Sequence, residues 1–315
     1  MYSLVFPKVV NVSSTAVAEF TKLLENIYRS VNIGLVNEMK VVASKMGVDI
    51  WEVIEAAKTK PFGFKAFYPG PGLGGHCIPI DPFYLTWKAK EYGVNTKFIE
   101  LAGEINRAMP QFVVNAANEA LNDRKKSING SKILIIGLAY KANVDDMRES
   151  PAFYLMDSLK SCGAEINYFD PHIPKIPVTR EHGDWTGLES VKWEESLISN
   201  YDCVIISTAH DQIDFSDLAK WADCIVDTRN AMDGISTNEN QVTKADSITF
   251  HQLKESTNGI HEDDDIVRKI SIRLVSFMWS NLGIVPPIFP SMEIIFTCLL
   301  YTSDAADDTP CVDLG

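Results

Sequence analysis

The chain has 315 residues, and its 42 acidic and 29 basic side chains give a formal net charge of -13. That acidity argues against nucleic acid as a partner, because phosphate binding needs a basic surface. With 46% hydrophobic and 23% charged residues, the composition is globular and excludes collagen, a coiled coil, simple disorder and a disulfide scaffold. The length predicts about two domains.

The first third of the chain predicts helices. Ser13, Ser14 or Thr15 is expected to cap a long helix, Asp49 a second, and Asp81 a third. A fourth helix carries Pro110, where we expect a kink or a break. The expected ranges are about 15–46, 49–60, 81–93 and 96–122.

The pattern changes after Gly130, where short apolar runs begin to alternate with helical segments. Strands are expected at 132–136, 165–169, 202–207 and 224–227, with helices at 151–162, 193–199 and 214–221. Such alternation is typical of a doubly wound parallel sheet. The sequence therefore predicts an α/β protein with a helical domain at 1–124 and a sheet domain at 125–245. We expect residues 246–315 to be a non-native or disordered tail.

The cysteines and the apolar stretches indicate the compartment. None of the six cysteines forms a closely spaced pair, so we expect no zinc or other metal site. The N-terminus lacks the pattern of a signal peptide. The most apolar stretch, 272–300, is interrupted by Arg273 and three prolines, which argues against a membrane span. These features predict a reduced, cytoplasmic protein.

A glycine-rich loop at 70–75, GPGLGG, matches the dinucleotide pattern G-x-G-x-x-G literally. The context is wrong, because no strand precedes it and no acidic residue closes a βαβ unit about 20 residues on. We expect these glycines instead to let a ligand approach the backbone.

Cys77 follows this loop and precedes the predicted helix start at Asp81. A helix N-terminus lowers the pKa of a thiol, so Cys77 is a candidate nucleophile; the alternative is a buried structural cysteine. Neighbouring side chains often point apart, which favours loop packing over catalysis for His76. The Asp81 carboxylate could cap its helix and also hold a water beside Cys77.

Other candidates are polar residues that could equally be surface charges. Lys22 and Asn26 share one face of the long helix. Lys141 and Arg148 follow the first predicted strand, and Arg229 follows another, where ligands bind in parallel sheets. The adjacent acids at 145–146 are expected to pair with Arg148 rather than to bind a metal.

Taken together, four motifs in this order resemble the UDP-glucose/GDP-mannose dehydrogenase family. They are TKLLENIYRSVNIGLVNEM, GPGLGGHCIPIDP, GLAYKANVDDMRESP and VDTRNAM, with an Asp-Pro at 170–171 before the last. The resemblance covers about residues 7–245. It implies a helical central domain used for dimerisation, followed by a Rossmann-like UDP-sugar-binding domain. It also implies oxidation of a sugar C6 alcohol to a carboxylate with two NAD⁺.

The resemblance assigns roles to individual residues. It makes Cys77 the nucleophile that carries a thiohemiacetal and then a thioester, with Lys22, Asn26 and Asp81 around it. The loop of Phe67, Tyr68, Gly70, Gly72, Gly74 and Gly75 would wrap the substrate. Lys141 and Arg229 would also contact the UDP-sugar, and Arg148 would contact NAD.

The motif GGHCIPIDP is similar to that of the UDP-N-acetylhexosamine 6-dehydrogenases, because Ile80 stands where UDP-glucose enzymes usually carry Lys. UDP-N-acetylglucosamine or UDP-N-acetylmannosamine is therefore the expected substrate. The family's N-terminal NAD-binding domain is missing, so we expect a fragment that binds NAD poorly and does not turn over. UDP-glucose oxidation, a non-catalytic nucleotide-sugar module, and an acyl-transfer enzyme using Cys77 and His76 are the alternatives.

Overall fold

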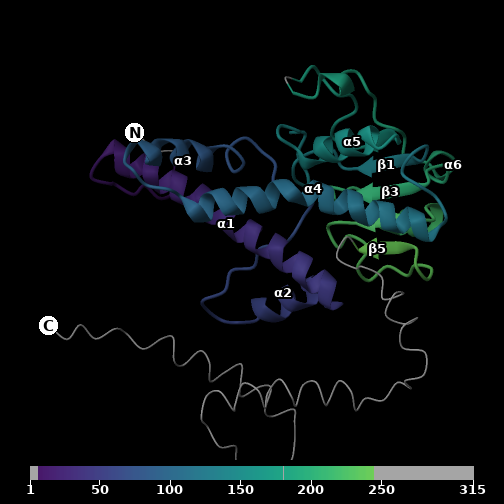
Figure 1. The fold of residues 1–315 in the computed structure, drawn as a ribbon, viewed down its shortest axis with the longest axis horizontal. Helices are drawn as coiled ribbons and strands as arrows, with labels where there is room; N and C mark the ends of the chain where they lie inside the picture. The colour runs from purple at the N-terminus through teal and green to yellow at the C-terminus, as the bar shows by residue number, and fades with distance from the viewer. Residues whose placement is uncertain (1–5, 180, 245–315) are drawn as a thin grey trace, which may run out of the picture. The chain divides into compact units, whose positions relative to one another are not determined.

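A computed structural model describes residues 6–179 and 181–244 (Figure 1). The expectations for the tail at 246–315, and for the stretch at 272–300 within it, lie outside the described residues. Among the helices of the described part, none combines the length and the apolar character that a membrane crossing needs.

Four helices come first in the chain. They are α1 (Thr15–Met46), α2 (Ile50–Lys58), α3 (Asp81–Glu91) and α4 (Lys97–Asp123). The Ser14 hydroxyl accepts the backbone N–H of Val17 at the start of α1, and the Asp49 carboxylate accepts those of Trp51 and Glu52 at the start of α2. Both predicted caps are therefore confirmed, because each side chain satisfies helix N–H groups that lack a partner within the helix.

The structure corrects the expected cap of α3 and the break expected at Pro110. The N-cap of α3 is Ile80, which makes no side-chain capping bond, and Asp81 is already the first helical residue. Helix α4 also continues through Pro110 without a break. A proline inside a helix costs about 3 kcal/mol. Burial of Met109 and Val113 on either side of it offsets that cost.

The second half of the described chain forms a five-stranded parallel sheet in the order β2-β1-β3-β4-β5. The strands are β1 (Lys132–Ile136), β2 (Glu165–Phe169), β3 (Cys203–Ile206), β4 (Ile225–Asp227) and β5 (Val242–Lys244). The accompanying helices are α5 (Pro151–Ser161), α6 (Glu195–Ile198) and α7 (Phe215–Trp221), with a 3-10 turn η2 (Gly183–Trp185). The predicted parallel sheet is confirmed, whereas β5 was missed because its three half-buried residues form no apolar run.

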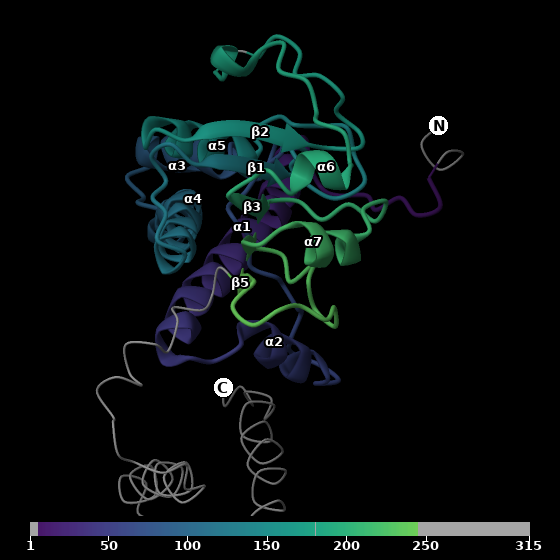
Figure 2. The same ribbon diagram turned by 90° about the vertical axis from the view of Figure 1, so that its right-hand side faces the viewer.

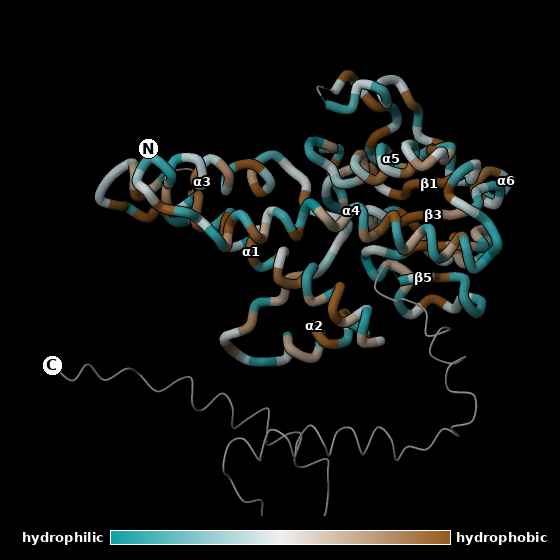
Figure 3. The backbone as a smooth tube through the Cα atoms, viewed as in Figure 1, coloured by the Kyte–Doolittle hydropathy of each residue, from teal (hydrophilic) through white to brown (hydrophobic). Residues whose placement is uncertain are grey.

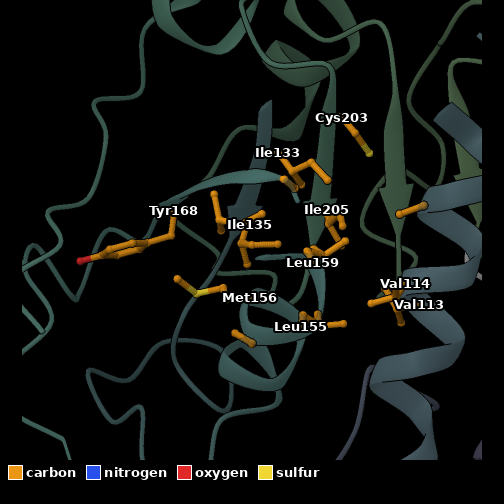
Figure 4. Packing of buried hydrophobic residues seen from close by; sticks show 14 of the residues in the cluster. Val113, Val114, Ile133, Ile135, Leu155, Met156, Leu159, Tyr168, Cys203 and Ile205 are labelled. Carbon is orange, nitrogen blue, oxygen red and sulfur yellow. The ribbon is translucent and has the colours of Figure 1, made fainter. Parts of the chain in front are cut away.

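Helices cover both faces of this sheet, with α4 and α5 on one face and α6 and α7 on the other (Figure 2). Alternate residues of β1 separate into two cores. Ile133 and Ile135 pack with Val113 and Leu155, as the close-up shows (Figure 4). Leu134 packs on the opposite face in the second core. The hydrophobic colouring of β1 and β3 in Figure 3 follows from this burial on both sides.

Helix α4 belongs to both halves of the structure. Its first half packs against α1, where Ala102 lies so close to Gly34 that a Cβ there would be 3.2 Å from the Ala102 Cα. Its second half lies on the sheet through Val113 and Leu121. One continuous helix therefore connects the helical region to the sheet, and the loop at 70–75 is held against both.

The buried face of α1 is polar and small rather than apolar. Its buried residues are Asn26, Ser30, Gly34, Asn37, Lys40, Ala43 and Ser44. The apolar residues at helical spacing are largely exposed in this single chain, namely Val17, Phe20, Leu24, Leu35 and Met39. The packing face of α1 within the chain is thus the one that brings amide side chains to the glycine-rich loop.

Candidate active site

Cys77 and Asp81 are brought together by one tight turn. The Cys77 carbonyl accepts the backbone N–H of Ile80 over 3.1 Å and that of Asp81 over 2.8 Å. The turn leads directly into α3, whose first N–H groups carry partial positive charge. Cys77 is partly exposed and unpaired, so its thiol is accessible at the start of this helix.

Asn26 connects this turn to α1. Its side-chain amide is buried and donates to Asp81 Oδ2 over 2.9 Å. The structure therefore joins two of the predicted site residues from distant parts of the chain. Lys22, one turn earlier on α1, is exposed and instead pairs with Glu25 at 3.2 Å.

His76 does not pack into the loop, so that expectation is wrong. Its side chain is exposed, and its Nδ1 lies 3.3 Å from the Cys77 sulfur. The two neighbouring side chains point toward each other because the chain turns between them. An imidazole at this distance can exchange a proton with the thiol.

The absence of side chains at the glycines of 70–75 makes room for other parts of the protein. A Cβ on Gly70 would lie 2.5 Å from Arg229 Nη1, and a Cβ on Gly74 would lie 2.6 Å from the Cβ of Tyr140. The Gly75 N–H also donates to the Arg148 carbonyl over 3.0 Å. The loop therefore docks onto the carboxyl edge of the sheet, beside the residues that follow β1 and β4.

Two buried asparagines that sequence reasoning missed hold this loop from the other side. Asn37 Oδ1 accepts the Gly70 N–H over 3.0 Å, and its Nδ2 donates to Asn106 Oδ1 over 2.9 Å. Asn106 in turn donates to the Ser30 carbonyl over 3.1 Å. The available signal was the spacing of Asn26, Ser30 and Asn37, which places all three on one helix face.

The aromatic residues that open the loop make protein contacts. Tyr68 stacks on Trp51 with the ring centroids 5.8 Å apart, and its hydroxyl donates to Glu55 over 2.6 Å. Phe67 meets Tyr28 edge to face at 5.6 Å. These contacts fix the start of the loop between α1 and α2.

The segment after β1 carries Lys141 and Arg148, and both are exposed. Arg148 forms a two-pronged ion pair with Asp146, from 2.6 to 3.1 Å, as expected for one of the adjacent acids. This pairing lowers the pKa of the Asp146 carboxyl. Lys141 lies over the Tyr140 ring, 5.7 Å from its centroid.

Arg229 lies where the glycine-rich loop meets the end of β4. Its Nε donates to the Ser207 carbonyl over 2.7 Å, and its backbone N–H donates to Asp227. Burial lowers the pKa of the guanidinium to about 10, and Asp227 acts in the opposite direction. The group remains a cation at neutral pH, and it points at the Gly70 backbone.

A cavity of about 380 Å³ lies behind the cysteine turn. Ile78, Ile80 and Phe83 line one side, and Asn106 and Pro110 of α4 line the other. Among the described residues there is no group of His, Cys, Asp and Glu side chains that could bind a metal ion.

Comparisons with known proteins match two regions of the chain to known domains. Residues 16–108 match the central domain of the UDP-glucose/GDP-mannose dehydrogenase family, and residues 134–234 match the UDP binding domain of that family. The chain is 37% identical over 202 residues to UDP-N-acetyl-D-mannosamine dehydrogenase of Methanococcus maripaludis, covering 64% of this chain and 43% of that protein. It is 33% identical over 200 residues to UDP-N-acetyl-D-glucosamine 6-dehydrogenase of Pseudomonas aeruginosa, covering 64% and 46%.

The fold is also similar to a solved structure. The UDP-D-ManNAc dehydrogenase of Pyrococcus horikoshii superposes with a TM-score of 0.63 at 31% identity, over 73% of this chain and 52% of that one. The chain spans less than half the length of the two curated relatives named above. Through its central and UDP-binding domains, the chain belongs to the UDP-glucose/GDP-mannose dehydrogenase family.

Proposed function

We propose that the protein takes part in the NAD-dependent oxidation of the C6 alcohol of a UDP-N-acetylhexosamine to the uronic acid. Residues 1–124 would supply the helical domain with the reactive cysteine, and residues 125–245 the UDP-binding domain. The observation that carries the proposal is the Asn26–Asp81 hydrogen bond beside the accessible Cys77. It places a thiol and an oriented carboxylate within one turn of chain, as covalent catalysis followed by hydrolysis requires.

The described residues do not form a dinucleotide site of their own. Arg148 is the one residue that we assign to NAD, and its guanidinium is exposed and already paired with Asp146. The loop at 70–75 packs on protein at the positions where a dinucleotide fingerprint would leave backbone free for a pyrophosphate. Two steps are therefore assigned to this chain's own residues. The first is the addition of the Cys77 sulfur to C6, and the second is the attack of water on the thioester.

The first of these steps is capture of the C6 aldehyde. The Cys77 sulfur forms a bond to C6, and the aldehyde oxygen gains a proton, which gives a thiohemiacetal. His76 Nδ1, 3.3 Å from the sulfur, can receive the thiol proton. Lys22 and Asn26 on α1 are the side chains that we place nearest the reacting oxygen, where a cation and an amide donor stabilise negative charge.

The second step is hydrolysis of the thioester that follows oxidation at C6. A water oxygen attacks the carbonyl carbon, the carbon–sulfur bond breaks, and Cys77 leaves as the thiolate. Asp81 is the residue that we assign to this water. Because Asn26 holds its Oδ2, the carboxylate keeps a fixed orientation while Oδ1 accepts from the water.

The UDP moiety is assigned to the carboxyl edge of the sheet. Lys141 after β1 and Arg229 after β4 are cations at the edge where parallel sheets bind ligands. Phe67, Tyr68 and the glycines at 70, 72, 74 and 75 would contact the sugar nucleotide from the loop above. The substrate proposal favours an N-acetylated sugar, which the names of the curated relatives and the Ile80 position both support.

A homodimer is the assembly that we propose. The apolar residues of α1 at helical spacing are exposed in the single chain, with Phe20 56% and Leu24 59% accessible. A row of large apolar side chains on one face of a 32-residue helix is typical of a protein interface. A second copy of α1 would bury this row.

Differential alkylation of cysteine tests the placement of substrate at Cys77. Iodoacetamide labelling is measured by mass spectrometry with and without UDP-N-acetylglucosamine, and the exposed Cys162 serves as an internal control. The proposal predicts slower labelling of Cys77 with the sugar nucleotide and unchanged labelling of Cys162. Equal labelling of Cys77 at saturating sugar nucleotide would contradict it.

A further inference from the structure

His210 fastens the segment between β1 and α5 to the sheet. This side chain follows β3 and is completely buried. Its Nδ1 accepts the backbone N–H of Asn143 over 3.0 Å, and its Nε2 lies 3.1 Å from Asp170 Oδ2. Because Nδ1 is an acceptor, the neutral ring carries its proton on Nε2 and donates it to Asp170.

Asn143 is held from a second direction as well. Its Nδ2 donates to Asp211 Oδ2 over 2.7 Å, and its Oδ1 accepts the Asp211 N–H over 3.0 Å. Its backbone is left-handed, with a φ of 63°, which makes a sharp turn two residues after Lys141. The position of Lys141 at the mouth of the site therefore depends on how firmly Asn143 is fixed.

The Asp170 end of this chain of bonds is rigid. Its Oδ2 accepts the N–H groups of Leu138 and Ala139, and its Oδ1 accepts those of His172 and Ile173. Four backbone N–H groups thus fix Asp170, whereas a single hydrogen bond joins the imidazole to the Asn143 backbone, whose side chain is held separately by Asp211.

The groups around His210 determine what a second proton would do. Asp170 faces Nε2, the His172 ring lies 4.8 Å away between centroids, and Asp211 bonds to Asn143. A second proton must go to Nδ1, where it would face the Asn143 N–H, so the two donors would repel each other. The Asp170 carboxylate stabilises the resulting imidazolium, so the contact with Asn143 is the one that breaks.

We propose that His210 is a positioning residue for the Lys141 segment and that it works only as the neutral imidazole. Acidification then breaks the hydrogen bond from the Asn143 N–H, while the Asn143 side chain stays bonded to Asp211, and the loosened backbone weakens binding of the UDP-sugar. The inference rests on the proposed function, in which Lys141 contacts that ligand. In this view His210 holds the Lys141 segment in place in a pH-dependent way, although it does not touch the substrate.

Two substitutions of His210 each keep one of the two hydrogen-bonding positions of the imidazole and remove the other. In His210→Asn, the side-chain oxygen falls near the position of Nδ1 and can still accept from Asn143, but it does not titrate. In His210→Gln, the amide reaches the position of Nε2 and can donate to Asp170, but the acceptor for Asn143 is lost. A role in filling space alone would make the two variants equivalent.

Calorimetric titration with UDP-N-acetylglucosamine between about pH 8 and about pH 5.5 tests this proposal. The wild-type protein should lose about tenfold in affinity toward the acid end, as expected for one lost hydrogen bond. His210→Asn should bind as tightly as wild type at pH 8 with a flat profile, and His210→Gln should bind about tenfold more weakly throughout. The proposal would be overturned if the wild-type protein and both His210 variants bound with equal affinity, or if both variants kept the wild-type pH dependence. His172→Gln should keep the wild-type profile.

Hydrogen exchange of the Asn143 amide in the unliganded wild-type chain decides the inference without any ligand or variant. After correction for intrinsic exchange, protection of this amide should fall about tenfold between the neutral and the acid end of the same pH range. Constant protection would overturn the inference even if the sugar nucleotide binds. Absence of binding at every pH, with the exchange change present, would instead count against the proposed function.

Discussion

Asn26 donates to Asp81 over 2.9 Å across 55 residues of sequence, and this bond attaches the cysteine turn to the long helix α1. Asp81 is thereby an oriented carboxylate rather than a helix cap. Its neighbour in the turn, Cys77, keeps an accessible thiol. The turn that carries Cys77 is thus held by helix α1 as well as by its own backbone hydrogen bonds.

Replacing Asn26 with Leu should destabilise the chain by about 1–3 kcal/mol, because the Asp81 carboxylate loses its donor in a partly buried site. Urea denaturation measures this change. Thr21→Ala, on an exposed part of the same helix, is the matched control and should stay within about 0.5 kcal/mol. Equal stability of Asn26→Leu and Thr21→Ala would show that the bond contributes nothing.

A methyl group at Gly74 should displace the glycine-rich loop from the sheet. Its Cβ would lie 2.8 Å from the Glu149 carbonyl as well as against Tyr140, so overpacking should cost about 1–3 kcal/mol. Gly74 does not have a left-handed backbone, so Gly74→Ala tests packing without backbone strain. Gly183→Ala, which meets no atom within 4 Å, should leave thermal stability and UDP-sugar binding unchanged. Normal UDP-sugar affinity in Gly74→Ala would refute the docking of the loop.

The free energy of unfolding should decrease at low pH because Asp170 becomes protonated. Burial alone would raise the pKa of this carboxyl, but the bonds from His210 and from backbone N–H groups hold it below the ordinary value of 3.8. Ionised Asp170 therefore contributes its full share to the free energy of unfolding at pH values above 3.8, its ordinary pKa. That contribution is lost as the pH falls through the lower pKa of Asp170 in the folded protein. Asp170→Asn should cost about 3 kcal/mol or more at pH 7 and flatten the decline below pH 4.

This prediction is checked by measuring the urea denaturation midpoints of the wild-type protein and of Asp170→Asn between pH 7 and pH 3. Asp214→Asn is a useful control, because Asp214 is an exposed cap whose pKa is also lowered by hydrogen bonds. An acid decline in Asp170→Asn as steep as in wild type would assign the effect to other carboxylates.

Charge on the exposed row of α1 should prevent dimer formation. Leu24→Lys places a cation where two helices would meet, and desolvating that cation opposes association. Sedimentation velocity should show a wild-type dimer and a monomeric variant of unchanged helicity. Val178→Lys, at a position 86% exposed on the sheet half, should remain dimeric. A monomeric wild type would remove the basis for the proposed assembly.

Local patterns predicted most of the elements but not the packing face of the longest helix. Ser14 and Asp49 were recognisable caps because capping depends on neighbouring residues alone. The apolar row of α1 was easy to find, yet the face buried within the chain carries Asn26 and Asn37. Those amides are buried because distant partners satisfy them, and no local pattern contains that information.

In the candidate site, too, local patterns predicted some features, while others depend on contacts between distant parts of the chain. Motif order placed Cys77 and Asp81 correctly in one turn, but only the fold reveals that Arg229 lies against Gly70 and that His210 supports Asn143. These contacts join segments after different strands, and a parallel sheet brings such segments to one edge. The assigned roles of Lys141 and Arg148 stay predictions, because both side chains are exposed.

Calorimetric titration of the chain with UDP-N-acetylglucosamine, with UDP-glucose and NAD⁺ as comparisons, is the most direct test of the proposed substrate site. The UDP-N-acetyl sugar should bind more tightly than UDP-glucose, NAD⁺ should bind weakly, and Lys141→Ala should reduce the sugar-nucleotide affinity. No sugar-nucleotide binding by the folded chain, or equal affinity in Lys141→Ala, would contradict it.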